Sequence, residues 1–144
     1  IHDLSHQLHS NTLQQMGLQV ALKALCRNAT QQHHIDVELH SDNVSAISQE
    51  ADLCLFRVAQ EAINNAVKHG KAKHIEILLH MGDQAVCMKV IDKGSGFDPA
   101  VASNGLGLVS MQERLRFLGG HVFVNSKTGV GTEVTAELPL RRSA

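Results

Sequence analysis

The chain has 144 residues, the usual length of one domain, and its 43% apolar content is sufficient for a buried core. A formal net charge of −1, no Trp, no Tyr and only four Phe exclude a general nucleic-acid binder, which needs a basic excess and aromatic platforms. No apolar run is as long as a membrane span and no leader opens the sequence, so we expect a cytoplasmic protein without membrane contact of its own.

The three cysteines, Cys26, Cys54 and Cys87, are odd in number, far apart and surrounded by apolar residues. We therefore expect reduced core residues rather than disulfides. The chain starts without Met, inside a helical pattern, and is expected to be a piece of a longer protein.

A helical apolar pattern runs through residues 1–28, with Gly17 as a predicted break or bend. His2, His6 and His9 have the spacing of metal ligands on a helix. Since no Cys or Glu completes that set, an exposed histidine face is the simpler interpretation.

Residues 35–40 alternate apolar and polar, as a half-buried strand does, and Ser48 is a suitable N-cap for the next helix. That helix is expected to end near Gly70, in a left-handed residue. Its apolar stripe consists of Leu55, Val58, Ala59, Ala62, Ile63 and Ala66. Its polar stripe consists of Arg57, Gln60, Glu61, Asn64, Asn65 and Lys68. Glu61 and Asn65 lie one turn apart, so the polar stripe is either a solvated face or a site for a ligand or ion.

The second half of the chain predicts a hairpin of strands at residues 73–80 and 85–91, then a loop to residue 104. A helix at 107–118 should end at Gly119-Gly120, before strands at 121–126 and 132–138. The sum is an α+β fold, a two-layer sandwich of a single sheet with helices on one face.

The run DKGSGF at residues 92–97 directly follows a predicted strand. Its glycines would let the backbone approach a flat or charged ligand. A carboxylate at Asp92 accepts hydrogen bonds only, so it would bind the exocyclic amine of adenine and repel a carbonyl. The alternative is a tight turn with a solvated Asp.

Two further glycine segments lie at the ends of predicted elements. Residues 104–108 (NGLGL) open a helix, where backbone amides and the helix dipole bind phosphate. A Rossmann fingerprint does not fit there, because a loop and not a strand precedes the glycines. Gly129 to Thr132 alone is a hairpin turn.

The order of these motifs resembles the ATP-binding domain of two-component sensor histidine kinases. Residues 55–69 (LFRVAQEAINNAVKH), and MQERL before Gly119-Gly120, are similar to the nitrate-sensor and DesK-like subfamily. The resemblance implies the Bergerat ATP-binding fold, with one mixed, mostly antiparallel sheet. It also implies an N-terminal helical segment at 1–30, after a missing dimerisation domain, and an ATP-binding domain at 31–144, together one structural unit.

Site roles follow from the resemblance by position. The residues implied to contact the nucleotide are Asn65, Lys68, His69, Asp92, Gly94, Gly96, Phe97, Gly105, Leu106, Gly107, Leu108 and Thr132. Asn65 and Glu61 would hold Mg²⁺, Asp92 would select adenine, and Gly105 and Gly107 would be the hinges of a mobile lid at residues 98–104. Glu61 and Lys68 would take part in catalysis, although the chemical role of Glu61 stays open.

The implied activity is that of an ATP-dependent protein histidine kinase, with ATP and Mg²⁺ as cofactors. The γ-phosphoryl would pass to a histidine on the separate dimerisation domain and then to a response regulator. His2-Asp3 superficially fits the acceptor motif, but residues 4–18 resemble the segment after the dimerisation helices, so we expect the acceptor to be absent. We expect a monomeric fragment and a homodimeric parent, with or without a membrane anchor.

Two alternatives accompany this interpretation. One is an ATPase of the mismatch-repair, gyrase or heat-shock chaperone type, in which Glu61 would activate water. The short predicted lid and the run around Asn65 argue against it. The other is a nucleotide-sensing module without catalysis, which the full set of predicted ligand residues disfavours.

Overall fold

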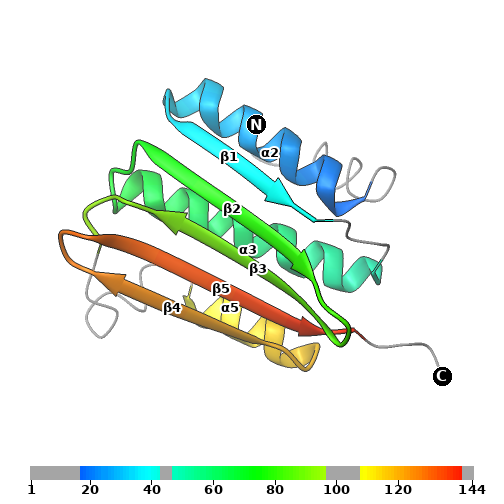
Figure 1. Ribbon diagram of the computed structural model, residues 1–144. Coiled ribbons are helices and arrows are strands. Elements are labelled where there is room, and N and C mark those ends of the chain that lie inside the picture. Colours follow the sequence, from blue (N-terminus) through cyan, green and yellow to red (C-terminus); the bar gives the residue numbers. More distant parts are fainter. Residues whose placement is uncertain (1–16, 43–46, 97–107, 141–144) are drawn as a thin grey trace.

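The computed structural model describes residues 17–42, 47–96 and 108–140, which form two layers (Figure 1). The elements in chain order are α2 (Leu18–His33), β1 (Asp36–Ser41), α3 (Gln49–Lys68), β2 (His74–Met81), β3 (Ala85–Asp92), α5 (Leu108–Phe117), β4 (His121–Lys127) and β5 (Gly131–Pro139). One five-stranded sheet has the order β1-β2-β3-β5-β4. Only the β1–β2 pair is parallel, and the other pairs are antiparallel. The predicted α+β sandwich with a mixed, mostly antiparallel sheet is confirmed.

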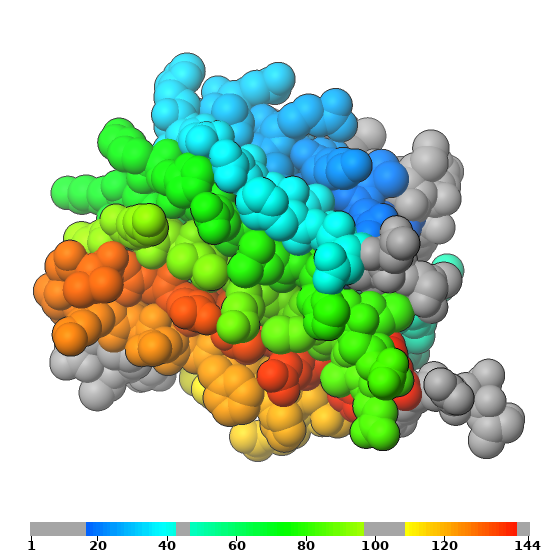
Figure 2. Space-filling view, viewed as in Figure 1, coloured from blue at the N-terminus to red at the C-terminus, as the bar shows by residue number. Residues whose placement is uncertain are grey.

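The helices cover one face of the sheet and leave the other face open (Figure 1). α3 provides the crossover that a parallel β1–β2 pair requires. Along β3 the side chains of Val86, Met88 and Val90 are buried under the helices, whereas Cys87 and Lys89 between them are only half-buried. The viewer of Figure 2 looks onto the open face, where the side chains of β2, β3 and β5 have no helix above them.

The core lies between the sheet and α3. All six residues of the predicted apolar stripe of α3 are buried: Leu55, Val58, Ala59, Ala62, Ile63 and Ala66. Phe56, Leu22 of α2 and Leu115 of α5 are buried among the same cluster of side chains. Hydrophobic periodicity therefore identified the buried face of this helix correctly.

The cysteines follow the prediction in two of three positions. All three are free thiols, and Cys26 and Cys54 are buried, which raises the pKa of each thiol to about 11. The prediction of a core position is wrong for Cys87, which is half-buried on the open face. Strand alternation is the reason, because its neighbours Val86 and Met88 take the covered face.

The boundaries of α2, α3 and α5 agree with the sequence signals at three positions, but α2 continues to His33, beyond the predicted end at residue 28. Gly17, at φ 88°, immediately precedes α2 and marks the predicted break. The Ser48 side chain accepts a hydrogen bond from the Ala51 backbone N–H at 3.1 Å and is the N-cap of α3. α5 ends at Phe117, and Gly119 follows it at φ 81°. The part of the predicted first helix at residues 1–16 lies outside the described residues.

The expected left-handed residue at the end of α3 is not Gly70. That conformation belongs to Lys71, at φ 49°. Gly70 still donates its N–H to the Asn65 carbonyl oxygen at 3.1 Å. The backbone therefore leaves the direction of α3 at Lys71, one residue after Gly70. A side chain at position 70 would still be crowded, because an added Cβ would lie 3.0 Å from the Ala66 carbonyl oxygen. No helix among the described residues is long and apolar enough to cross a membrane.

Candidate functional site

Asp92 is the buried charged residue of the described chain, with 7% of its surface exposed. It ends β3 on the helix-covered face, where Gly94 donates its backbone N–H to Oδ1 at 2.9 Å. Burial raises the pKa of the Asp92 carboxyl, while backbone hydrogen bonds from Gly94 and Thr132 act in the opposite direction. A buried acceptor at the end of the core is suited to a polar ligand that brings its own N–H groups.

Asp92 belongs to a polar row that crosses the covered face at this end of the sheet. Asp92 pairs with Thr132 of β5, and Thr132 pairs with Ser126 of β4. The hydroxyl groups of Ser126 and Thr132 lie 2.7 Å apart. The sequence analysis missed Ser126. The register of the last hairpin could have identified this residue, because it places Ser126 opposite Thr132 across the turn at Gly129.

Glycines let three chain segments pack backbone to backbone around Asp92. An added Cβ at Gly94 would overlap the Gly70 carbonyl oxygen, and one at Gly131 would overlap the backbone oxygen of Asp92. An added Cβ at Gly94 would also lie 3.1 Å from Asp92 Oδ1, and one at Gly70 would lie 3.5 Å from the same atom. The end of α3, the loop after β3 and the start of β5 therefore meet at this carboxylate.

Ser95 and Gly96 tie the loop after β3 to the rest of the sheet end. The Ser95 N–H donates to the Gly70 carbonyl oxygen at 2.7 Å, and the Gly129 N–H donates to the Ser95 carbonyl oxygen at 2.6 Å. Gly96 has φ 67°, and an added Cβ would overlap the Lys127 carbonyl oxygen. Close backbone packing is thus the observed reason for Gly94 and Gly96, and their predicted contact with the nucleotide stays a prediction.

The polar stripe of α3 approaches Asp92 at the end of the helix. Glu61 and Asn65 are half-buried, while Lys68 and His69 are exposed in the last turn and at the C-cap. The Asn65 carbonyl oxygen accepts the N–H groups of His69 and Gly70, at 2.9 and 3.1 Å. Because Gly70 directly borders the Asp92 carboxylate, Asn65 and Lys68 lie at the same end of the molecule as the polar row.

The second predicted glycine segment falls largely outside the described residues. Its residues Gly105, Leu106 and Gly107 are not described. Three other predicted features also lie outside the described residues: Phe97, the lid at 98–104 and the candidate acceptor His2. Leu108 is the first residue of α5, so a helix does begin where the phosphate-binding segment was predicted.

A hollow of about 560 Å³ lies between α2 and β1. It is lined by Lys23, Cys26, Arg27, Thr30, Gln31, Val37 and Leu39. None of these residues belongs to the predicted nucleotide site. The candidate functional site is therefore the surroundings of Asp92, because a buried charge and closely packed backbones converge there.

Comparison with known proteins identifies the family of the chain. Residues 50–142 match the family described as histidine kinase-, DNA gyrase B-, and HSP90-like ATPase. The sensor histidine kinase MctS of Rhizobium johnstonii is 35% identical over an alignment 144 residues long. The alignment covers 96% of this chain and 31% of that protein. The chain therefore spans less than a third of this relative's length.

The solved histidine kinase domain of the blue-light activated histidine kinase from Erythrobacter litoralis EL346 shares the fold. Its TM-score is 0.72 at 20% identity, over 85% of this chain and 61% of that one. A longer structure of the same kinase also has a TM-score of 0.72, over 42% of its chain. From the match over most of the chain and the agreement of the fold, the chain belongs to the ATP-binding family of histidine kinase-, DNA gyrase B- and HSP90-like ATPases.

Proposed function

We propose that the chain is the ATP-binding catalytic domain of a sensor histidine kinase. It binds Mg-ATP and donates the γ-phosphoryl to a histidine on a separate dimerisation domain of its parent, for onward transfer to a response regulator. The observation that carries the proposal is the buried Asp92 carboxylate at the end of β3, bordered by Gly70, Gly94 and Thr132. The relative named as a sensor histidine kinase favours the kinase among the members of the family.

The adenine end of the site is placed at Asp92. Its carboxylate accepts backbone hydrogen bonds that favour the charged form, against the raised pKa that burial produces. An ionised carboxylate in this position attracts an exocyclic amine and repels a carbonyl oxygen, and so distinguishes adenine from guanine. Thr132, opposite Asp92 on β5, supports the same side of the base.

The phosphate end is placed along the last turns of α3. The Asn65 amide oxygen and the Glu61 carboxylate, one turn apart, are oxygen ligands of the kind that Mg²⁺ prefers. Bound Mg²⁺ would neutralise phosphate charge, and the exposed Lys68 ammonium adds a positive charge at the helix end. Phosphoryl transfer needs mainly positioning and charge neutralisation, which these side chains supply. A domain that uses ATP and serves a response regulator would work in the cytoplasm, and we propose that location for it, in a homodimeric parent with or without a membrane anchor.

Titration calorimetry with ATP, in the presence and absence of Mg²⁺, tests the site. Asp92→Asn should weaken ATP binding at least about tenfold under both conditions, because its amide presents a donor as well as an acceptor. Asn65→Ala should weaken only the Mg²⁺-dependent part of the binding. Asp83→Asn and Asn125→Ala make the same changes at exposed positions away from the site and should bind as the wild type. Equal affinity in all five proteins would refute the site.

Phosphotransfer separates the kinase from the ATPase alternative. The chain is mixed with the histidine-bearing dimerisation domain of its parent and with radiolabelled ATP, and both labelled protein and free phosphate are measured. Labelling of the added domain with little phosphate release supports the proposal. Steady hydrolysis without labelling, lost in Glu61→Gln, would instead assign Glu61 as the base of an ATPase.

A further inference from the structure

Histidine and carboxylate side chains gather on the open face of the sheet, at the β1 edge. The parallel register pairs Asp36 with His74 and Glu38 with Glu76, and alternation places these side chains on the same face. His40 follows Glu38 on that face of β1. We call Asp36, Glu38, His40, His74 and Glu76 the open-face cluster. None of the described helices covers this face (Figure 2).

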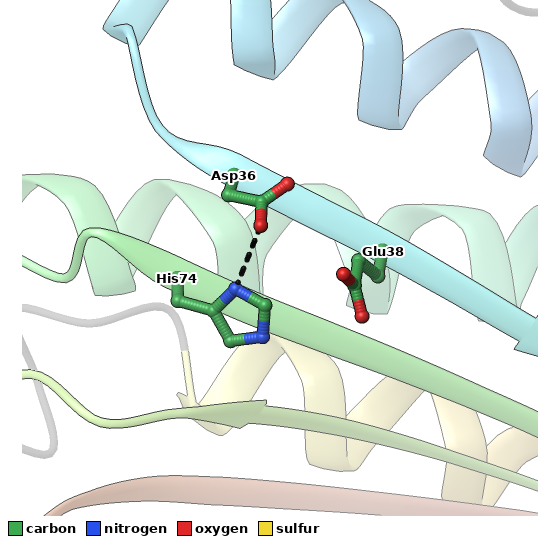
Figure 3. Close-up of side chains that lie close together, drawn as sticks. All are labelled: Asp36, Glu38 and His74. Atoms are coloured by element: carbon green, nitrogen blue, oxygen red, sulfur yellow. Dashed lines mark hydrogen bonds and ion pairs between the residues drawn. The ribbon is translucent and has the colours of Figure 1, made fainter.

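The ligand atoms of the cluster already lie close together. Figure 3 shows the His74 ring between the strands, with Asp36 and Glu38 projecting toward it from β1. His74 Nδ1 lies 3.1 Å from Asp36 Oδ2, and His74 Nε2 lies 3.3 Å from Glu76 Oε1. Two groups of three residues have one ligand atom each within 4.8 Å of the others. One group is Asp36, Glu38 and His74, and the other is Glu38, His40 and Glu76.

These separations suit a small tetrahedral cation. Ligands bound to Zn²⁺ at about 2.0–2.1 Å lie about 3.4 Å from one another, a spacing that falls within the 4.8 Å that bounds the ligand atoms of the cluster. Imidazole nitrogens beside carboxylates are ligands for Zn²⁺ and similar transition metals, whereas Mg²⁺ and Ca²⁺ prefer oxygen ligands alone. Two adjacent strands of one sheet also hold the ligands on a rigid base.

The charges of the cluster favour a cation as well. Among the described residues, the ion pairs of Asp36, Glu38 and Glu76 are made to histidines and none is made to Lys or Arg. When those histidines are neutral, the three carboxylates repel one another across two strands. A divalent ion among them would replace that repulsion with attraction.

We propose that the open-face cluster binds one Zn²⁺ ion through Asp36, Glu38 and His74, with His40 or Glu76 completing the ligand set. This site is separate from the Mg-ATP position. Asp92 is buried on the covered face, whereas the cluster is on the open face of the same sheet. The two sites nevertheless share a segment, because the Asp36 N–H donates to the Lys73 carbonyl oxygen at 2.9 Å, and Ile75 beside His74 pairs with Asp92.

The metal alone tests this proposal. Calorimetry with ZnCl₂ near neutral pH, with bound zinc counted after dialysis, should give one site in the wild type that is retained in the presence of ATP. His74→Ala and Glu38→Gln should each lower its affinity at least about tenfold. His121→Ala removes an exposed histidine at the opposite edge of the sheet and should leave the affinity unchanged. The variant with alanine at His2, His6 and His9 removes the helix-spaced histidines and should also bind as the wild type.

Three outcomes would overturn the site. They are wild-type zinc affinity in His74→Ala, loss of binding in the triple-histidine variant, and comparable affinity for MgCl₂ or CaCl₂, which would indicate a general acidic patch. Far-UV circular dichroism and thermal unfolding without metal verify that each variant is folded. The absorption spectrum of bound Co²⁺ supplies a second readout, since tetrahedral ligation including a histidine should change in His74→Ala. Mg-ATP affinity should stay at the wild-type value in His74→Ala, so failure of this site leaves the proposed nucleotide site untouched.

Discussion

The two faces of the sheet use the same strands for opposite purposes. On the covered face, alternate residues of β3 are buried apolar side chains until the row ends in the Asp92 carboxylate. On the open face, the intervening residues are half-buried or exposed, and charged groups lie side by side. A carboxylate on the covered face is isolated and held by backbone N–H groups, whereas one on the open face shares solvent and histidine partners. The difference shows that burial, more than residue type, decides what each carboxylate can do.

Titration behaviour makes the same distinction. Burial raises the pKa of Asp92, so its proton affinity reflects desolvation. The pKa of the His74 imidazole is also raised, by its hydrogen bond to Glu76 and then by Asp36, with desolvation acting against them. The first shift destabilises the folded protein as pH rises and the carboxyl ionises. The second contributes stability that is present at low pH and is lost as pH rises through the raised pKa of His74.

Adjacent residues of β2 offer the largest contrast between the faces. Ile77 is fully buried, whereas Leu78 is half-buried on the open face. Ile77→Ala should lower the free energy of unfolding by about 2–5 kcal/mol through lost burial and a cavity. Leu78→Ala should lower it by about 1 kcal/mol or less, because it leaves no enclosed cavity. Urea unfolding measures both, and equal losses would contradict the assignment of the two faces.

Close packing at the end of the covered face gives the next effect. In Gly94→Ala the new Cβ would overlap the Gly70 carbonyl oxygen, and the backbone there must shift. We expect a loss of about 1–3 kcal/mol in unfolding free energy, together with weaker ATP binding. Gly82→Ala is the matched control, since its nearest neighbour would be the Ala85 carbonyl oxygen at an ordinary 3.5 Å. Wild-type stability in Gly94→Ala would show that the three segments do not meet as described.

Asp52, half-buried in the first turn of α3, predicts a smaller and pH-dependent effect. Burial raises the pKa of its carboxyl from 3.8 to about 6. Because the folded pKa is the higher one, the penalty is absent below pH 4, grows between about 4 and 6, and is constant above that range. Asp52→Asn should therefore stabilise the protein by about 1 kcal/mol at pH 7, discounted for partial exposure and for the lost helix-dipole contact.

The control for this profile is Glu50→Gln, at an exposed position in the same turn. This variant loses a carboxylate near the helix N-terminus, and no buried charge is removed with it. It should therefore not raise the free energy of unfolding at pH 7. Urea unfolding at about pH 4 and pH 7 measures the effect for both variants. An Asp52→Asn advantage that is larger at the lower pH would reverse the expected sign and reject the burial explanation.

Several features could be predicted from the sequence because they depend on neighbours along the chain. Periodicity of 2 or 3.6 residues identified the strands and the buried stripe of α3, and Ser48 marked the start of that helix through its own side chain. The order of the motifs around Asn65, Asp92 and Thr132 pointed to the family that the comparison then showed. The contacts of these residues with nucleotide and Mg²⁺ stay predictions.

By itself, then, the sequence determined most of the elements, the buried face of α3 and the family, since each of these is written in local pattern. Only the tertiary structure decided that β1 pairs with β2 and β3 with β5, and that Lys71 rather than Gly70 turns left-handed. It alone brought Asp36 and His74 together across 38 positions of sequence. The physical reason is that pairing and backbone packing depend on distant segments of the chain, whose meeting no local pattern of polarity encodes.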